Sequence, residues 1–153
     1  MINITLPDGT VKQFEKNSSP HDVAMSISSG LARSIISARF NDTTVETTTS
    51  LATDGNLILY TFDSPEGKKA FWHSSAHLLA QAITFFYPNV KLTIGPAIDN
   101  GFYYDLDLEG ETISEKDFKK IEDKMIDFAR GKHNFSLRSI SKADALTFYK
   151  EHN

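Results

Sequence analysis

The first residues alternate between hydrophobic and polar side chains, which is typical of a strand with one buried face. Apolar residues alternate with polar ones over residues 2–6, and a Pro-Asp-Gly turn at 7–9 leads into VKQFEK, so the opening predicts a β-hairpin. Phe14 falls out of phase with Val11. Either a bulge intervenes or the register of the second strand differs.

A helix is predicted next. Ser19 has the form of an N-cap, Pro20 stands at the first helical position, and Asp22 follows three residues after the cap. We expect this helix to end near Gly30. Its predicted inward residues are Val23, Ala24 and Ile27.

Three more strands complete the first unit. SIISARF, the Asn41-Asp42 turn and TTVET predict a second hairpin, and Asp54-Gly55 introduces the apolar strand NLILYTF. One helix across a small mixed sheet in the order β-β-α-β-β-β indicates an α+β, ubiquitin-like β-grasp fold. The turn-rich segment DSPEGKK reads as a linker, so we divide the chain into residues 1–62 and 63–153.

The second unit begins with a helical pattern over residues 66–86, which Pro88 ends. Two strand candidates, VKLTIGPAI and GFYYDLDL, precede a helix from Ser114 to Gly131, a strand NFSLRSI and a third helix SKADALTFYKEHN. This order indicates an α/β unit. The inward residues are predicted to be Trp72, Ala76, Leu79, Ile83 and Phe86 in the first helix, and Phe118, Ile121, Met125 and Phe128 in the second.

The composition supports folded cores and narrows the class of protein. The chain is 40% hydrophobic with eleven Phe, unlike a disordered sequence. It lacks a run of ~20 apolar residues and a secretory signal pattern, so we expect a cytoplasmic protein that does not enter membranes. It has no cysteine, which excludes disulfides and thiolate metal sites within these 153 residues.

The formal net charge of −4 argues against binding to nucleic acid by overall charge. A local basic run nevertheless lies between residues 128 and 143, where no Asp or Glu occurs. Arg130, Lys132 and Arg138 are its candidate RNA-binding residues. The alternative is an ordinary solvated surface.

His73 and His77 are the candidate catalytic residues. They are four apart, so they project from one helix face beside the apolar stripe. Their column continues through Ala80 and Thr84, which are small and should leave room beside the rings. Such a pair can bind a metal, or can hold a water and a substrate hydroxyl through neutral nitrogens. An ordinary structural role is the third possibility, and the HExxH zinc-protease pattern is absent because position 74 is Ser.

Longer motifs favour catalysis. HSSAHLLAQAI followed by KLTIGPAIDNGFYYD is similar to the editing-domain motif of threonyl-tRNA synthetases, and LPDG, SPHDVA and ISSGLA resemble the TGS domain of that family. The resemblance runs along the whole chain. It implies a β-grasp TGS domain at 1–62 and the first part of a two-layer α/β editing domain at 63–153.

The resemblance also implies a reaction. The parent enzyme, a class II threonine–tRNA ligase, charges threonine-accepting tRNA and hydrolyses seryl-tRNA formed in error, because a missing methyl gives only about 1–3 kcal/mol of discrimination. His73 and His77 would orient the terminal ribose hydroxyls and a water, with no metal, and Tyr104 would line the seryl pocket. ATP, magnesium and zinc would serve the synthetase core, which we expect to be homodimeric, while this region needs no cofactor. Ser75 stands where some members have Cys.

The departure from the family lies in what these residues lack. The family pairs HxxxH with a later CxxxH, and this chain contains neither a cysteine nor a class II ATP-binding motif. We therefore expect a part of a longer enzyme that does not deacylate tRNA alone. Two other functions stay open: a non-catalytic TGS interaction module, although the GTPase loop GxxxxGK[ST] is absent, and a zinc-dependent editing protein of the alanyl type.

Overall fold

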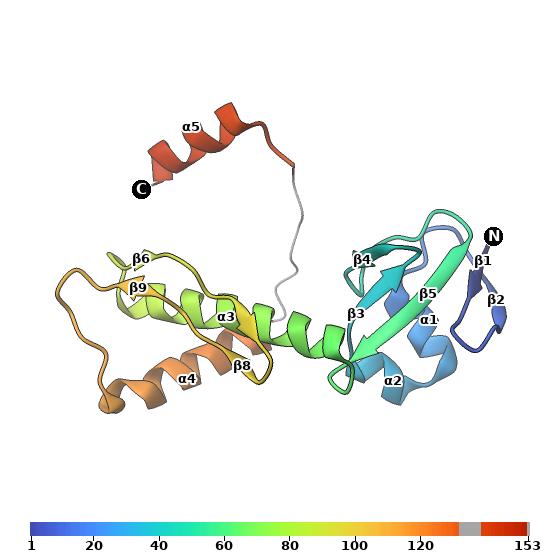
Figure 1. Ribbon diagram of the computed structural model, residues 1–153, viewed down its shortest axis with the longest axis horizontal. Helices are drawn as coiled ribbons and strands as arrows, with labels where there is room; N and C mark the ends of the chain where they lie inside the picture. Colours follow the sequence, from blue (N-terminus) through green and yellow to red (C-terminus); the bar gives the residue numbers. More distant parts are fainter. Residues whose placement is uncertain (132–138, 153) are drawn as a thin grey trace.

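A computed structural model describes residues 1–131 and 139–152. The chain folds into a β-sheet unit at the N-terminus, from which one long helix leads into a second unit (Figure 1). The α+β class is as predicted.

Between residues 1 and 61, five strands form one mixed sheet in the order β2-β1-β5-β3-β4. Strand β1 pairs parallel with β5, and the remaining neighbours are antiparallel. This parallel central pair with flanking hairpins is the β-grasp arrangement. The strands are β1 (Ile2–Thr5), β2 (Val11–Phe14), β3 (Ile35–Phe40), β4 (Thr43–Val45) and β5 (Gly55–Thr61).

The first hairpin shows why Phe14 and Val11 are out of phase. The β1–β2 ladder runs without a shift from Ile2↔Phe14 to Thr5↔Val11. Phe14 packs against the core, whereas Val11 is 57% exposed. This hairpin therefore has no bulge. Val11 and Phe14 are out of phase because Val11 lies on the solvent face of β2 and Phe14 on its core face.

Two helices, not one, lie between β2 and β3 in the chain. Helix α1 (Pro20–Ile27) has the predicted capping box between Ser19 and Asp22. The prediction that Ile27 faces inward is wrong, since this side chain is 45% exposed. The chain leaves α1 at Ser28, which also accepts the Leu31 N–H as N-cap of the unpredicted helix α2 (Ser29–Ser34). Gly30 therefore lies inside a second helix and does not end the first.

The core of this unit lies between the sheet and α1. Its fully buried members come from the strands, the helix and the β4–β5 segment, and they are Ile2, Ile4, Val23, Ala38, Leu51 and Leu57. Strand β1 contributes the alternate residues Ile2 and Ile4, as expected of a strand in a sheet with one covered face.

The capping box of α1 gives a pH-dependence prediction. The Ser19 N–H and hydroxyl bond the Asp22 carboxylate and lower its pKa below the ordinary 3.8. A lowered pKa in the folded state gives stability that is present above about pH 4 and is lost as the pH falls further. Asp22→Asn should therefore lose part of the acid-dependent change in unfolding free energy, and Ser19→Ala should cost about 1 kcal/mol at pH 7.

Urea unfolding of the 153-residue chain between pH 7 and pH 3 measures both effects. Asp42→Asn, in the β3–β4 turn, is the matched control. An Asp22→Asn chain whose stability changes with pH as in the parent chain would contradict the prediction.

The predicted linker DSPEGKK is wrong, because most of it is helical. Strand β5 ends at Thr61, and Ser64 already caps helix α3 (Pro65–Phe86). Only residues 62–64 lie between them. Ser64 and Pro65 occur often in turns, but Ser and Pro also begin helices, as they do here.

In the second unit, two segments within residues 91–107 pair as an antiparallel ribbon. This ribbon and helix α4 (Glu115–Arg130) pack against α3. The two predicted strands pair antiparallel, but they break into β6 (Lys91–Leu92), β7 (Ala97–Ile98), β8 (Gly101–Phe102) and β9 (Leu106–Asp107). The Thr93 N–H donates to the Asp105 carbonyl and the Asp105 N–H donates to the Ile94 carbonyl, and these two bonds continue the pairing between the pieces. The ladder is interrupted at Pro96, which has no N–H to donate, and resumes where β7 pairs with β8.

The core of this unit confirms most of the predicted stripe. Ile83 and Ile121 are buried, with Leu79, Phe86, Met125 and Phe128 packed against them. Ala76 is also buried. The prediction for Phe118 is wrong: it is 52% exposed, because α4 presents only its Ile121 side to α3.

The last described element is helix α5 (Lys142–His152), the predicted third helix. Most of the predicted strand NFSLRSI falls on residues 132–138, outside the described residues. No helix in the described part of the chain is long and apolar enough to span a membrane.

Candidate functional site

The junction between the two units fixes the direction of α3. The Ser64 N–H and hydroxyl both donate to the Thr61 carbonyl oxygen, at 3.1 and 2.9 Å, and the Ser64 hydroxyl accepts the Gly67 N–H at 3.0 Å. Gly67 is buried so close to Thr61 that an added Cβ would lie 2.6 Å from the Thr61 carbonyl carbon. Helix α3 is therefore held tightly against the end of β5.

Aromatic rings reinforce this junction. Phe62 lies edge-on to Phe71 and Trp72, with ring centroids 5.1 and 5.8 Å apart, and Trp72 also contacts Phe102 of β8 at 6.3 Å. Edge-to-face pairs of this kind stabilise by ~0.5–1.5 kcal/mol each. The cluster ties the end of β5, α3 and β8 together directly before His73 in the chain.

His73 and His77 lie together on α3, as the helical spacing predicts. Their ring centroids are 4.5 Å apart at an interplanar angle of 88°, and the two Nε2 atoms are 3.1 Å apart. Both residues are exposed. One ring must donate its Nε2–H and the other must accept, so the pair in this geometry holds at least one neutral imidazole.

An open hollow of about 870 Å³ lies beside the two rings. From α3 it is lined by the two histidines with Phe71, Ser74, Ser75, Leu78 and Gln81. The prediction that Ala80 and Thr84 provide this space is wrong. The hollow opens on the side of Ser74 and Gln81, because Ala80 is turned toward the buried face of α3.

The opposite wall of this hollow comes from elements that are distant in sequence. The N-terminal unit contributes Ile36, Glu46, Thr47 and Thr48, and α4 contributes Phe128 and Ala129. Sequence reasoning missed the four residues of the N-terminal unit. No motif marks them, since their position depends on how α3 leaves β5.

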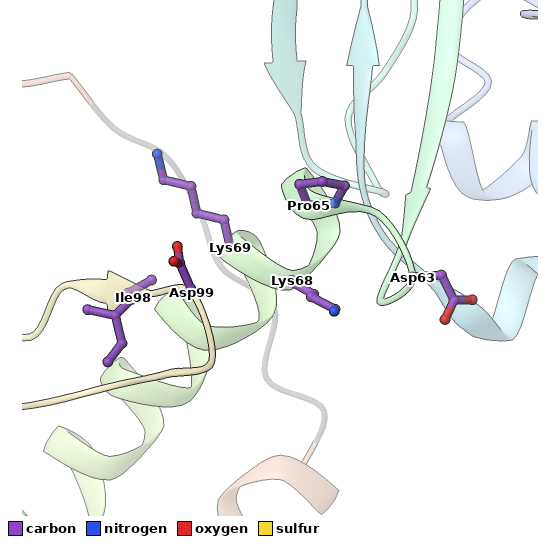
Figure 2. Close-up of a pocket in the computed structure, with 7 residues that line it drawn as sticks. Asp63, Pro65, Lys68, Lys69, Ile98 and Asp99 are labelled. Carbon is purple, nitrogen blue, oxygen red and sulfur yellow. The ribbon is translucent and has the colours of Figure 1, made fainter.

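A second hollow, of about 540 Å³, lies at the start of α3 (Figure 2). Its lining includes Asp63 and Lys68 near the junction and Ile98 and Asp99 at the β7–β8 turn. Figure 2 shows the charged ends of these side chains pointing apart. They do not converge on one point as the histidines do.

The other predicted site residues lie elsewhere. Tyr104 is not among the residues that line the histidine hollow; its ring is half-buried against Gly95, where an added Cβ would lie 3.0 Å from the ring atom Cγ. Arg130 is exposed at the C-terminal end of α4. Lys132 and Arg138 lie outside the described residues.

Within the described residues, the histidine pair is not part of a larger ligand cluster. Among residues 1–131 and 139–152, no group of three or more His, Cys, Asp or Glu side chains is placed to hold a metal ion. In the described geometry, the two rings offer hydrogen-bonding nitrogens beside an open, mixed polar and apolar hollow.

Comparison with known proteins agrees with the β-grasp architecture. Residues 2–61 match the TGS domain family. The match covers the five-stranded sheet with α1 and α2.

The chain is similar over nearly its whole length to threonine–tRNA ligases, and this similarity together with the TGS match supports an N-terminal part of such a ligase. It is 59% identical to threonine–tRNA ligase from Flavobacterium johnsoniae over 151 residues. The aligned region covers 99% of this chain and 23% of that relative. The ligase of Caldanaerobacter subterraneus is 45% identical over 148 residues, and that of Cytophaga hutchinsonii is 42% identical over 151. The chain thus spans about a quarter of the length of these relatives.

Proposed function

We propose that this chain forms the part of a threonine–tRNA ligase that holds the aminoacyl end of wrongly charged seryl-tRNA for hydrolysis. The supporting observation is the His73–His77 pair, with Nε2 atoms 3.1 Å apart beside a hollow of about 870 Å³. ATP-dependent charging of tRNA with threonine is the proposed activity of the longer enzyme.

The chemistry needs groups that orient a hydroxyl and a water. Hydrolysis of the ester transfers a proton from the attacking water and returns one to the ribose oxygen that leaves. The His73–His77 hydrogen bond uses both Nε2 atoms, and in two neutral rings it leaves one Nδ1 as an acceptor and the other Nδ1 as a donor, one for each partner of this exchange. Positioning of the two reacting groups in one geometry supplies much of the rate.

The need for hydrolysis follows from the substrates. Serine lacks one methyl group of threonine, and a synthetic pocket gains only about 1–3 kcal/mol from that methyl. A separate hydrolytic site can instead exploit the smaller size of serine. Tyr104, with an apolar ring and a polar tip, is proposed to line that pocket when the remaining part of the ligase is present.

Transfer RNA is the proposed partner. Arg130 is proposed to meet a phosphate near the hollow, because it is exposed at the end of α4 and Phe128 and Ala129 of the same turn line the hollow. Lys132 and Arg138 are proposed to extend this contact. A guanidinium pairs well with phosphate oxygens.

The test uses the complete ligase that contains this region. Preformed seryl-tRNA and threonyl-tRNA, both made on threonine-accepting tRNA, are offered separately, and release of the amino acid is followed with time. We expect seryl-tRNA to be hydrolysed at least ~100-fold faster, and the 153-residue chain alone to be inactive. Equal rates for the two substrates, or robust hydrolysis by the short chain, would contradict the proposal.

A further inference from the structure

The wall that faces the histidines is held in place by the N-terminal fold. Residues 46–48 lie between β4 and β5, in a segment whose Leu51 is buried in the sheet core. The Thr47 carbonyl accepts the His21 N–H at 2.9 Å, and the Thr49 N–H donates to the Glu46 carbonyl at 3.1 Å. This short turn is therefore fixed to α1 and to the core.

The opposite wall is fixed to the same fold. Helix α3 leaves β5 through the Thr61, Ser64 and Gly67 contacts, and β3 and β5 both contact α3. The distance between the two walls is consequently set by one folded unit, without a flexible linker. The hollow between them is a built feature of the chain.

The hollow is larger than a seryl group requires. Its volume of about 870 Å³ lies near the upper end of the ~300–1,000 Å³ range of small-molecule sites. The ring of Phe71, which is 40% exposed, offers a surface on which a nucleic-acid base can stack. Space and lining therefore suit a nucleoside in addition to its amino acid.

Glu46 defines the polarity of the wall that faces the histidines. It is the only carboxylate among the described residues that line this hollow, and Thr47 and Thr48 stand next to it. A carboxylate accepts hydrogen bonds and repels phosphate, so its partner is a group with N–H or O–H donors that carries no negative charge. The base and sugar of a nucleoside carry such donors.

We infer that the N-terminal unit is a wall of the hydrolytic site, and that Glu46 binds the terminal nucleoside of the tRNA while the histidines hold its aminoacyl ester. The inference rests on the proposed function, because it assigns the far side of the same hollow. Glu46 is a binding residue in this assignment and takes no part in the proton transfers.

Steady-state hydrolysis of seryl-tRNA by the complete ligase tests this assignment. Glu46→Ala should raise KM about tenfold and leave kcat within twofold, because a hydrogen bond to a charged group is lost in ground state and transition state alike. The KM of Glu46→Gln, which keeps an acceptor oxygen, should lie between the KM of the parent and that of Glu46→Ala. Glu15→Ala, at an exposed position of the same unit away from the hollow, is the control and should have no effect.

The outcomes separate this inference from the proposed function. An unchanged KM for Glu46→Ala, or a fall in kcat without a rise in KM, would overturn the role of Glu46. If alanine at both histidines abolishes hydrolysis in the same experiments, only the present inference fails. If the double histidine variant hydrolyses seryl-tRNA at the parent rate, the proposed function fails and this inference falls with it.

Discussion

Replacement of both His73 and His77 by Ala in the complete ligase is expected to let seryl-tRNA accumulate while threonine charging stays within about twofold. The two rings lie on one face of α3 with Nε2 atoms 3.1 Å apart, and both border the hollow. Loss of positioned acid–base groups typically lowers a rate by ~10²–10⁴-fold. Seryl-tRNA that forms in error would then be released faster than it is hydrolysed.

The measurement is the fraction of tRNA that carries serine after incubation with ATP and serine. His21→Ala is the matched control, because this histidine is exposed in the first turn of α1 and does not line the hollow. Each single histidine variant should accumulate seryl-tRNA to an intermediate or full extent. A collapse of threonine charging without any accumulation would assign the pair to another role.

Gly67→Ala is expected to destabilise the folded chain by about 2–3 kcal/mol, although alanine normally favours a helix. In an open helix this change stabilises by about 0.5–1 kcal/mol. Here the new Cβ would overlap the Thr61 carbonyl and would lie 2.9 Å from the Ser64 hydroxyl oxygen. Backbone must move to relieve the overlap, and overpacking of this kind costs ~1–3 kcal/mol before the lost junction hydrogen bonds are added.

Urea unfolding of the 153-residue chain compares this variant with Gly30→Ala. Gly30 lies in α2, and its nearest atom to an added Cβ is the Ser28 hydroxyl oxygen at 3.8 Å, an ordinary contact. Gly30→Ala should be neutral or stabilising. Equal stability of the two variants would show that the junction can open at little cost, and would remove the basis for a fixed hollow.

Most elements were predictable because their determinants are local. The capping boxes at Ser19 and Ser114 each need residues within one turn, and the structure contains both. The apolar stripe of α3 can be predicted from the helical period alone. The His73–His77 contact follows from the same period, since residues four apart on a helix are neighbours.

The errors occurred where one residue can serve two structures. Ser28 closes α1 and also caps α2, which is why the prediction that α1 ends near Gly30 is wrong. Ser64 and Pro65 are turn formers that here begin a helix of 22 residues. Phe118 repeats with the apolar period of α4, yet it lies beyond the face that α3 covers.

The candidate site could be predicted on one side only. The α3 side depends on spacing within a helix, whereas the wall formed by Ile36 and residues 46–48 depends on a junction that closes across the whole N-terminal unit. The sequence also predicts the wrong side of α3 for the opening of the hollow, which lies beside Ser74 and Gln81 and not beside Ala80 and Thr84. That side is determined by which residues the ribbon covers, and this is a tertiary property.

Single-turnover hydrolysis of preformed seryl-tRNA tests the central role of the histidine pair most directly, because it bypasses charging. The complete ligase in excess over seryl-tRNA is compared with its His73→Ala, His77→Ala double variant. The account predicts that the rate constant for release of serine falls by ~10²–10⁴-fold in the double variant. A rate constant within about twofold of the parent would contradict it.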